Sequence, residues 1–107
     1  MKYLIDTSDE FEKSLKEIAR NQRSIKKDIK KLGESLSDNP RQGILIKDNV
    51  YKIRMAITSK GRGKSAGARV ITYVIDEDET VFLIDIYDKS EQENISDSRI
   101  QHIIDNL

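Results

Sequence analysis

The chain has 107 residues, with 19 Lys or Arg, 19 Asp or Glu, one His and no Cys. This length predicts one domain, residues 1–107, able to remove about two-thirds of its unfolded surface from water. The lack of cysteine excludes disulfides and thiolate metal sites and is typical of a reducing compartment. No apolar run approaches ~18 residues and no signal-peptide pattern opens the chain, so we expect a cytoplasmic protein without a membrane partner.

The net charge is zero, but the charges are segregated along the chain. Residues 1–40 carry nine basic and eight acidic side chains. Residues 41–75 carry eight basic and one acidic, and residues 76–107 carry two basic and ten acidic. The central excess of cations indicates a polyanionic partner such as nucleic acid, and the alternative is a solvated strand-and-loop face, which most charge clusters are.

The first 40 residues predict a short strand followed by two helices. Residues 2–6 alternate as a strand does, and Thr7 with Glu10, or Asp9 with Glu12, can cap the helix that follows. Two apolar stripes at helical spacing come next, separated near residues 20–22: Phe11, Leu15 and Ile18, then Ile25, Ile29, Leu32 and Leu36. Because a proline disfavours helical geometry at the residue before it, the second helix should end before Pro40.

The central region predicts two strands joined by a basic, glycine-rich loop. Residues 51–57 alternate, with Lys52 and Arg54 opposite an apolar set that includes Ile53 and Met55. The loop, residues 58–67, contains Lys60, Arg62 and Lys64, and we expect it to be mobile. A strand at residues 68–75 begins with Ala68 and Arg69. Before this region, residues 44–46 are either a short strand or a loop.

The last third predicts an acidic turn at residues 76–79, a strand at 80–89 and a closing helix. Strict alternation places Phe82, Ile84 and Ile86 on one face of that strand. It places these residues on the other: Val81, Leu83, Asp85, Tyr87 and Lys89. Ser96 should cap the helix, with Ile95 and Ile100 as a hydrophobic staple.

The order of these elements, β-α-α-β-β-β-α, predicts an α+β fold. We expect the helices to pack on one face of an antiparallel-rich sheet. Two chemistries are excluded. Gly63-Lys64-Ser65 lacks the upstream glycine and the following helix of a nucleotide-phosphate loop, and one histidine without cysteine or clustered acids offers no metal site.

Three motifs fall within residues 51–96: KIRMA at 52–56, SKGRGKS at 59–65 with GARVI at 67–71, and VFLIDIYDKSE at 81–91 with NIS at 94–96. Together they resemble the RelE/ParE toxin superfamily, specifically its HigB-like branch. The resemblance implies the same α+β architecture, with a concave catalytic surface on the sheet face opposite the helices. It also implies a ribosome-dependent messenger-RNA endonuclease, or mRNA interferase, of a type II toxin–antitoxin system. Its partners would be the ribosome, mRNA and a separate antitoxin of the helix-turn-helix kind, without a cofactor.

The resemblance also implies a set of site residues. Arg69 stands where the family places its catalytic arginine, and Lys52, Arg54 and Lys89 stand where it places further cations. RelE-type enzymes carry an arginine in place of Lys89, and their tyrosine near the position of Ile95 has no counterpart here. Tyr87 is the possible substitute. Asp85 is an unusual neighbour for a phosphate site, and it either orients Arg69 or Lys52 or marks a weaker enzyme.

The residue types suit cleavage by attack of the RNA 2′-hydroxyl on the adjacent phosphate, without metal. Arginine can stabilise the charge that builds on the phosphate oxygens, and a lysine among other cations can exchange protons. Lys60, Arg62 and Lys64 would contact the nucleic-acid backbone. Two alternatives remain open at this stage: a non-enzymatic, ParE-like toxin that binds DNA gyrase, and an RNA-binding module without catalysis.

Overall fold

The computed structural model describes residues 2–107 and contains one five-stranded sheet in the order β1-β5-β4-β3-β2. The strands are β1 (Leu4–Thr7), β2 (Ile44–Lys47), β3 (Val50–Met55), β4 (Ala68–Ile75) and β5 (Thr80–Asp88). β1 runs parallel to β5, and the other neighbouring strands are antiparallel. The helices are α1 (Asp9–Ala19), α2 (Ile25–Asp38) and α3 (Asp97–Asp105). The predicted α+β class is confirmed, and residues 44–46 belong to a strand.

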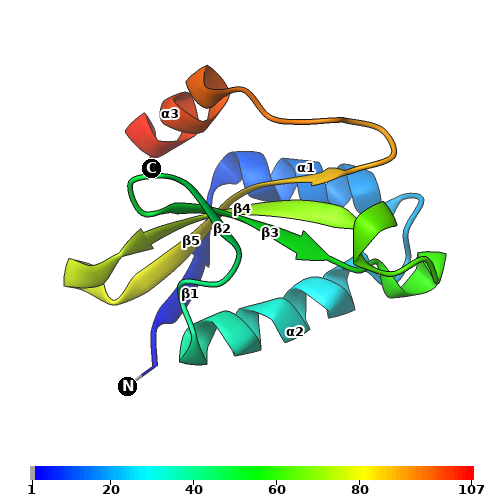
Figure 1. The fold of residues 1–107 in the computed structure, drawn as a ribbon, viewed down its shortest axis with the longest axis horizontal. Coiled ribbons are helices and arrows are strands. Elements are labelled where there is room, and N and C mark those ends of the chain that lie inside the picture. Colours follow the sequence, from blue (N-terminus) through cyan, green and yellow to red (C-terminus); the bar gives the residue numbers. More distant parts are fainter. Residues whose placement is uncertain (1) are drawn as a thin grey trace.

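The two faces of the sheet carry separate apolar clusters. Phe11, Leu15, Ile25 and Leu36 from α1 and α2 pack with one set of strand residues, including Val70. Ile100 and Ile103 from α3 pack on the other face. The sheet therefore lies between α2 and α3, as Figure 1 shows. α1 and α2 share a face as the sequence predicts, whereas α3 covers the opposite one.

A bulge in β5 overturns the strict alternation expected there. Ile71 pairs with Asp85 but Thr72 pairs with Leu83, so Ile84 is an extra residue on β5. Leu83 faces the α1–α2 side, whereas Tyr87, four residues later, faces α3. The prediction that Leu83 and Tyr87 share a face is wrong because the bulge shifts the period by one residue.

The N-cap of α1 differs from the sequence prediction, whereas the N-cap of α3 agrees with it. β1 continues to Thr7, so α1 begins after Ser8, and neither expected capping pair serves as its N-cap. The Phe11 N–H donates to Ser8 Oγ at 3.0 Å, while the Ser8 hydroxyl donates to the Ile84 carbonyl at 2.7 Å. Ser96 caps α3 as predicted, accepting from the Arg99 N–H at 3.1 Å.

Within residues 2–107, no helix combines the length and the apolar character that crossing a bilayer demands.

Candidate nucleic-acid interface

The site predicted from sequence is built around one row of side chains that crosses three strands. Arg54 on β3 pairs in register with Arg69 on β4, which pairs in turn with Tyr87 on β5. Lys52 lies two residues before Arg54 on β3 and pairs in register with Ile71. Ile71 and Tyr87 belong to the α3-side cluster, so the row lies on that face. The backbone register thus brings four of the five predicted catalytic residues together.

Arg69 is the most enclosed cation of the row, with 6% of its surface exposed. Its guanidinium donates to the carbonyl oxygens of Lys64 at 3.0 Å, Ala68 at 3.3 Å and Ser65 at 3.3 Å. Within residues 2–107 no carboxylate pairs with it. Of the five N–H donors of a guanidinium, two form no hydrogen bond with the described residues. Arg69 is therefore held in position with its charge uncompensated.

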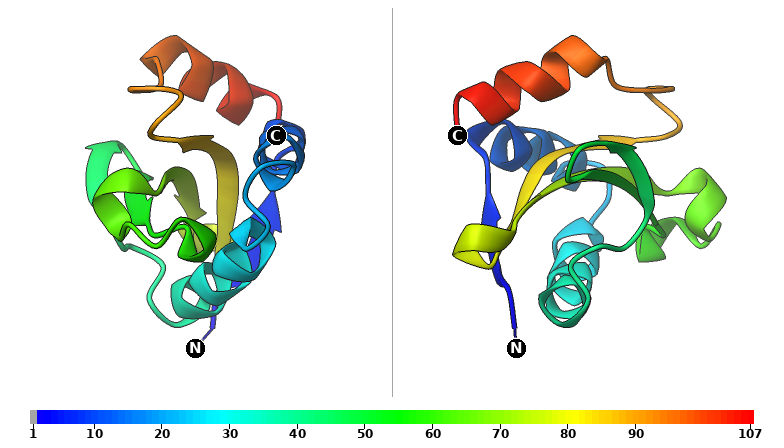
Figure 2. Two further views of the ribbon diagram at one scale, coloured as in Figure 1. Left: turned by 90° about the vertical axis from the view of Figure 1, so that its right-hand side faces the viewer. Right: turned by 60° about the vertical axis from the view of Figure 1, so that its left-hand side comes forward.

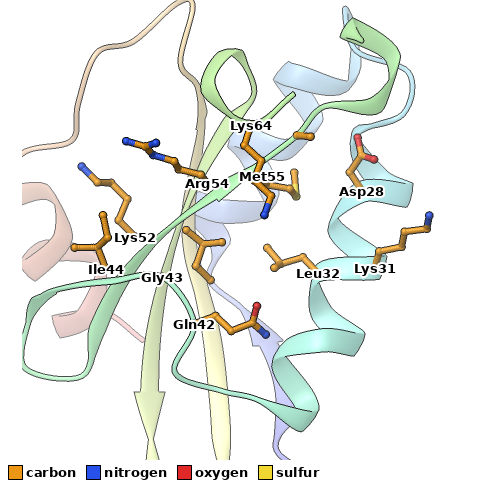
Figure 3. Close-up of a pocket in the computed structure, with 12 residues that line it drawn as sticks. Asp28, Lys31, Leu32, Gln42, Gly43, Ile44, Lys52, Arg54, Met55 and Lys64 are labelled. Carbon is orange, nitrogen blue, oxygen red and sulfur yellow. The ribbon is translucent and has the colours of Figure 1, made fainter. Parts of the chain in front are cut away.

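Arg54 and Lys52 are more accessible than Arg69. Arg54 is exposed and Lys52 is half-buried. In Figure 3 both side chains extend away from α2. Neither forms an ion pair with the residues that the structure describes. These two side chains, with Arg69 beside Arg54, make a cationic patch that attracts an anion.

Tyr87 and Lys89 close the row on the β5 side. Tyr87 is 4% exposed, and its hydroxyl has no hydrogen-bond partner among residues 2–107. Burial raises the pKa of Tyr87, and the nearby charge of Arg69 opposes that rise only in part. Lys89 Nζ pairs with Glu93 Oε1 at 2.8 Å, which lowers the pKa of Glu93. Tyr87 is thus a neutral phenol here, and Lys89 carries a mostly exposed counter-ion.

The basic loop projects beyond the sheet (Figure 2) and is fixed to α2 at its start. Asp28 of α2 accepts from the Thr58 hydroxyl at 2.6 Å, the Thr58 N–H at 3.0 Å and the Ser24 hydroxyl at 2.8 Å. Burial by itself would raise the pKa of Asp28, but these hydrogen bonds outweigh it and the pKa is lowered. The loop therefore leaves β3 along a defined path, which its glycines did not predict.

Lys60 differs from the other two loop cations. Its ammonium donates to Asp88 Oδ1 at 2.6 Å, to Ser90 Oγ at 3.2 Å and to the Ala66 carbonyl at 3.3 Å. Burial would raise the pKa of Asp88, but the bonds from Lys60 and Ser90 lower it below its usual value. Arg62 and Lys64, in contrast, are exposed. The structure thus separates three cations that the sequence treated alike.

Comparison with known proteins identifies the family. Residues 5–105 match the family described as the RelE toxin of the RelE / RelB toxin-antitoxin system. The chain belongs to the RelE toxin family.

Solved structures agree with this assignment. A free E. coli toxin RelE with two arginines replaced by alanine is 25% identical, with a TM-score of 0.61 over 87% of this chain and 90% of that one. A chain of the intact E. coli RelBE toxin-antitoxin complex is 22% identical, with a TM-score of 0.61 over 80% and 95%. The isolated E. coli RelE toxin is 23% identical, with a TM-score of 0.59 over 98% and 99%. The superfamily resemblance is confirmed, and the HigB-like branch stays a prediction.

In this RelE-family toxin, no hydrogen bond or ion pair among the described residues joins Asp85 to the cations of the row. Its carboxylate accepts from Arg99 Nε of α3 at 2.9 Å and from the Ser14 hydroxyl of α1 at 3.0 Å. The expectation that Asp85 orients Arg69 or Lys52 is therefore not met, because its carboxylate binds residues of α1 and α3 instead. Sequence reasoning missed three such contacts, from Asp28 to Thr58, from Asp88 to Lys60 and from Arg99 to Asp85, since no local pattern links these residues to their partners.

A groove of about 510 Å³ lies beside the patch, between α2 and β3 (Figure 3). Leu32, Ile53 and Met55 contribute apolar surface, and Lys31 and Lys64 are exposed cations among its lining residues. Within residues 2–107 no three His, Asp or Glu side chains gather as a metal site would require.

Proposed function

We propose that this RelE-family toxin is a ribosome-dependent mRNA endonuclease that acts in the cytoplasm and inhibits translation. The observation that carries the proposal is the cross-strand row of Arg54, Arg69 and Tyr87, with Lys52 beside it. Uncompensated cations held by a sheet form a preorganised site for a phosphate whose negative charge increases during reaction. The E. coli relatives of similar fold are named as toxins, which supports the same role here.

The proposed reaction is attack of a 2′-hydroxyl oxygen on the adjacent phosphorus, with loss of the hydroxyl proton to water. The bond to the 5′-oxygen of the next nucleotide breaks, that oxygen takes a proton from Tyr87, and Tyr87 is reprotonated by water. Arg69 binds the phosphate through its two remaining donors and stabilises the charge on the phosphorane oxygens. Arg54 and Lys52 bind the flanking phosphates. The products are a 2′,3′-cyclic phosphate and a 5′-hydroxyl, and this scheme uses no metal.

Proton transfer is assigned to the β5 side of the row. Tyr87 keeps its proton because burial raises its pKa, so it serves as a donor toward the leaving oxygen. Lys89 is close enough to Glu93 to be paired in the free toxin, and it becomes a further phosphate contact when RNA displaces that exposed carboxylate. The ribosome supplies the orientation of the mRNA, which a shallow cationic patch does not provide alone.

The proposed inhibitor is a cognate antitoxin. An E. coli structure of similar fold is the intact RelBE toxin-antitoxin complex, and another is RelE with a RelB-derived peptide. A protein encoded with this toxin, of the helix-turn-helix kind, would neutralise it by covering the cationic side.

The test is single-turnover cleavage of ribosome-bound mRNA by Arg69→Ala. We expect a loss of about 10²-fold, about 3 kcal/mol of barrier, with ribosome affinity nearly unchanged. Arg41→Ala is the matched control, because Arg41 pairs with the exposed Asp76 away from the row. If Arg69→Ala is folded by circular dichroism and cleaves like the wild type, the proposal fails. If the toxin then still arrests growth without cleaving mRNA, DNA gyrase becomes the candidate target, and a DNA supercoiling assay tests whether the toxin inhibits it.

A further inference from the structure

The bulge in β5 decides which face of the sheet Tyr87 occupies. It adds one residue, Ile84, to β5. In a ladder without this extra residue, Arg69 would pair with Ile86, and Tyr87 would lie on the face of α1 and α2. With the bulge, Arg69 pairs with Tyr87, which packs on the α3 side. The contacts that hold the bulge therefore also set the place of the proposed proton donor.

Side chains hold the bulge, because the neighbouring strand ends beside it. β1 pairs with β5 no further than Leu83. At the next residue, the Ser8 hydroxyl donates to the Ile84 carbonyl at 2.7 Å. The Ile86 N–H donates to Asp85 Oδ1 at 2.9 Å. Two polar side chains thus bind backbone groups of the bulge that lie beyond the reach of β1.

The Asp85 carboxylate connects the bulge to two helices. Its Oδ1 also accepts from the Ser14 hydroxyl of α1 at 3.0 Å, and its Oδ2 accepts from Arg99 Nε of α3 at 2.9 Å. Only 3% of Asp85 is exposed, so these donors replace the water that a buried carboxylate loses. In a ladder without the bulge, Asp85 would pair with Val70 and face α1 and α2, away from Arg99. The contacts of Asp85 therefore favour the bulged register.

We infer that Asp85 is a positioning residue for mRNA cleavage, because its carboxylate fixes the β5 bulge and so holds Tyr87 in the row with Arg69. This inference rests on the proposed function for the reaction and for the role of Tyr87 as proton donor. Asp85 forms no hydrogen bond or ion pair with the cations of the row among the described residues, so it acts through Tyr87.

The charge of Asp85 has a second effect on Tyr87. Burial is the main cause that raises the pKa of Tyr87. The charge of Arg69 lowers this pKa, and the charges of Asp85 and Glu93 raise it further. A neutral side chain at position 85 should therefore lower the pKa of Tyr87. A residue that only stabilised the fold would not have this effect, so the titration of Tyr87 tests the inference independently of activity.

The first experiment asks whether Asp85 acts through Tyr87. Asp85→Asn keeps the shape of the side chain and removes its charge. We expect single-turnover cleavage of ribosome-bound mRNA to fall about tenfold at saturation, with ribosome affinity nearly unchanged. In a Tyr87→Phe background, the same substitution should reduce the rate by less than about twofold, because the hydroxyl that Asp85 positions is already absent. Leu36→Val, in the buried core on α2, is the control for a general loss of stability and should cleave like the wild type.

NMR of the free toxin supplies a readout that needs no cleavage. The wild type should show nuclear Overhauser contacts between the backbones of Arg69 and Tyr87, and the Tyr87 ring should titrate above its usual pKa of about 10. In Asp85→Asn these contacts should weaken in favour of contacts between Arg69 and Ile86, and the titration should move to lower pH. In Leu36→Val both signals should stay as in the wild type.

Three results overturn the inference. The first is Asp85→Asn that cleaves like the wild type, the second is an equal loss of rate with and without the Tyr87 hydroxyl, and the third is an unchanged register and titration. If Asp85→Asn does not fold, Ser14→Ala replaces it in the same comparison. It removes only the donor from α1, and we expect a loss of about threefold that disappears in the Tyr87→Phe background. A wild-type toxin that cleaves no mRNA refutes the proposed function instead, and the NMR register then still shows whether Asp85 sets the place of Tyr87.

Discussion

Lys60 and Asp88 form an ion pair in which 14% and 6% of the two side chains are exposed. It is the one pair among residues 2–107 in which both partners are this enclosed. The pair ties the basic loop to the end of β5. That loop also supplies the Lys64 and Ser65 carbonyls that hold Arg69. A cation predicted to contact nucleic acid therefore also connects the loop beside Arg69 to the end of β5.

Replacing Lys60 should destabilise the fold. Lys60→Met leaves the buried Asp88 carboxylate without its counter-ion, and we expect a loss of about 3 kcal/mol in the free energy of unfolding. Arg62→Met, in the same loop but exposed, should change it by no more than about 0.5 kcal/mol. Urea denaturation of the two variants makes the comparison. Equal stabilities would show that the pair contributes nothing to folding.

The salt dependence of ribosome binding should distinguish Lys60 from the two exposed loop cations, Arg62 and Lys64. Removing Arg62 or Lys64 should reduce the slope of log affinity against log salt by about one. Lys60→Met should leave the slope unchanged because its charge is already neutralised by Asp88. Titrations over a salt series, on variants shown to be folded, give the slopes. A drop in slope for Lys60→Met would restore Lys60 to the predicted RNA contacts.

Tyr87→Phe should separate stability from activity. The Tyr87 hydroxyl is buried with no partner among the described residues, so its removal should leave stability unchanged or raise it by about 1 kcal/mol. Single-turnover cleavage should nevertheless fall by about 10²-fold, the usual contribution of a general acid. Thermal unfolding and cleavage are measured on one preparation. A stable variant with wild-type cleavage would remove Tyr87 from the mechanism.

Acid should weaken the attachment of the basic loop to α2. The pKa of Asp28 is lowered in the folded protein, so its contribution to stability is complete above the unfolded value of about 3.9. That contribution is lost as the pH falls through the lower, native pKa. Asp28→Asn should therefore cost about 2 kcal/mol at neutral pH and show a weaker pH dependence below about pH 4. Asp48→Asn, at an exposed site, is the control in urea titrations across this range. Parallel pH curves for the wild type and Asp28→Asn would contradict the assignment.

The sequence by itself determined the features that depend on local period and local chemistry. Alternation along residues 51–57 placed Lys52 and Arg54 on one face and Ile53 on the other, as the two apolar clusters show. The apolar stripes separated α1 from α2, and Ser96 marked the start of α3. These features follow from the direction of side chains within three or four residues, which the backbone geometry of a strand or a helix fixes.

Only the tertiary structure decided what depends on residues distant in the chain. The bulge at Ile84 brings Tyr87 into the row with Arg69, and strict alternation along β5 could not reveal it. The partners of Asp28, Lys60 and Asp85 lie on other elements, so composition showed only that charges were present. Pairing register, burial and ion-pair choice are set by the packing of whole elements, and no stretch of the sequence contains them alone.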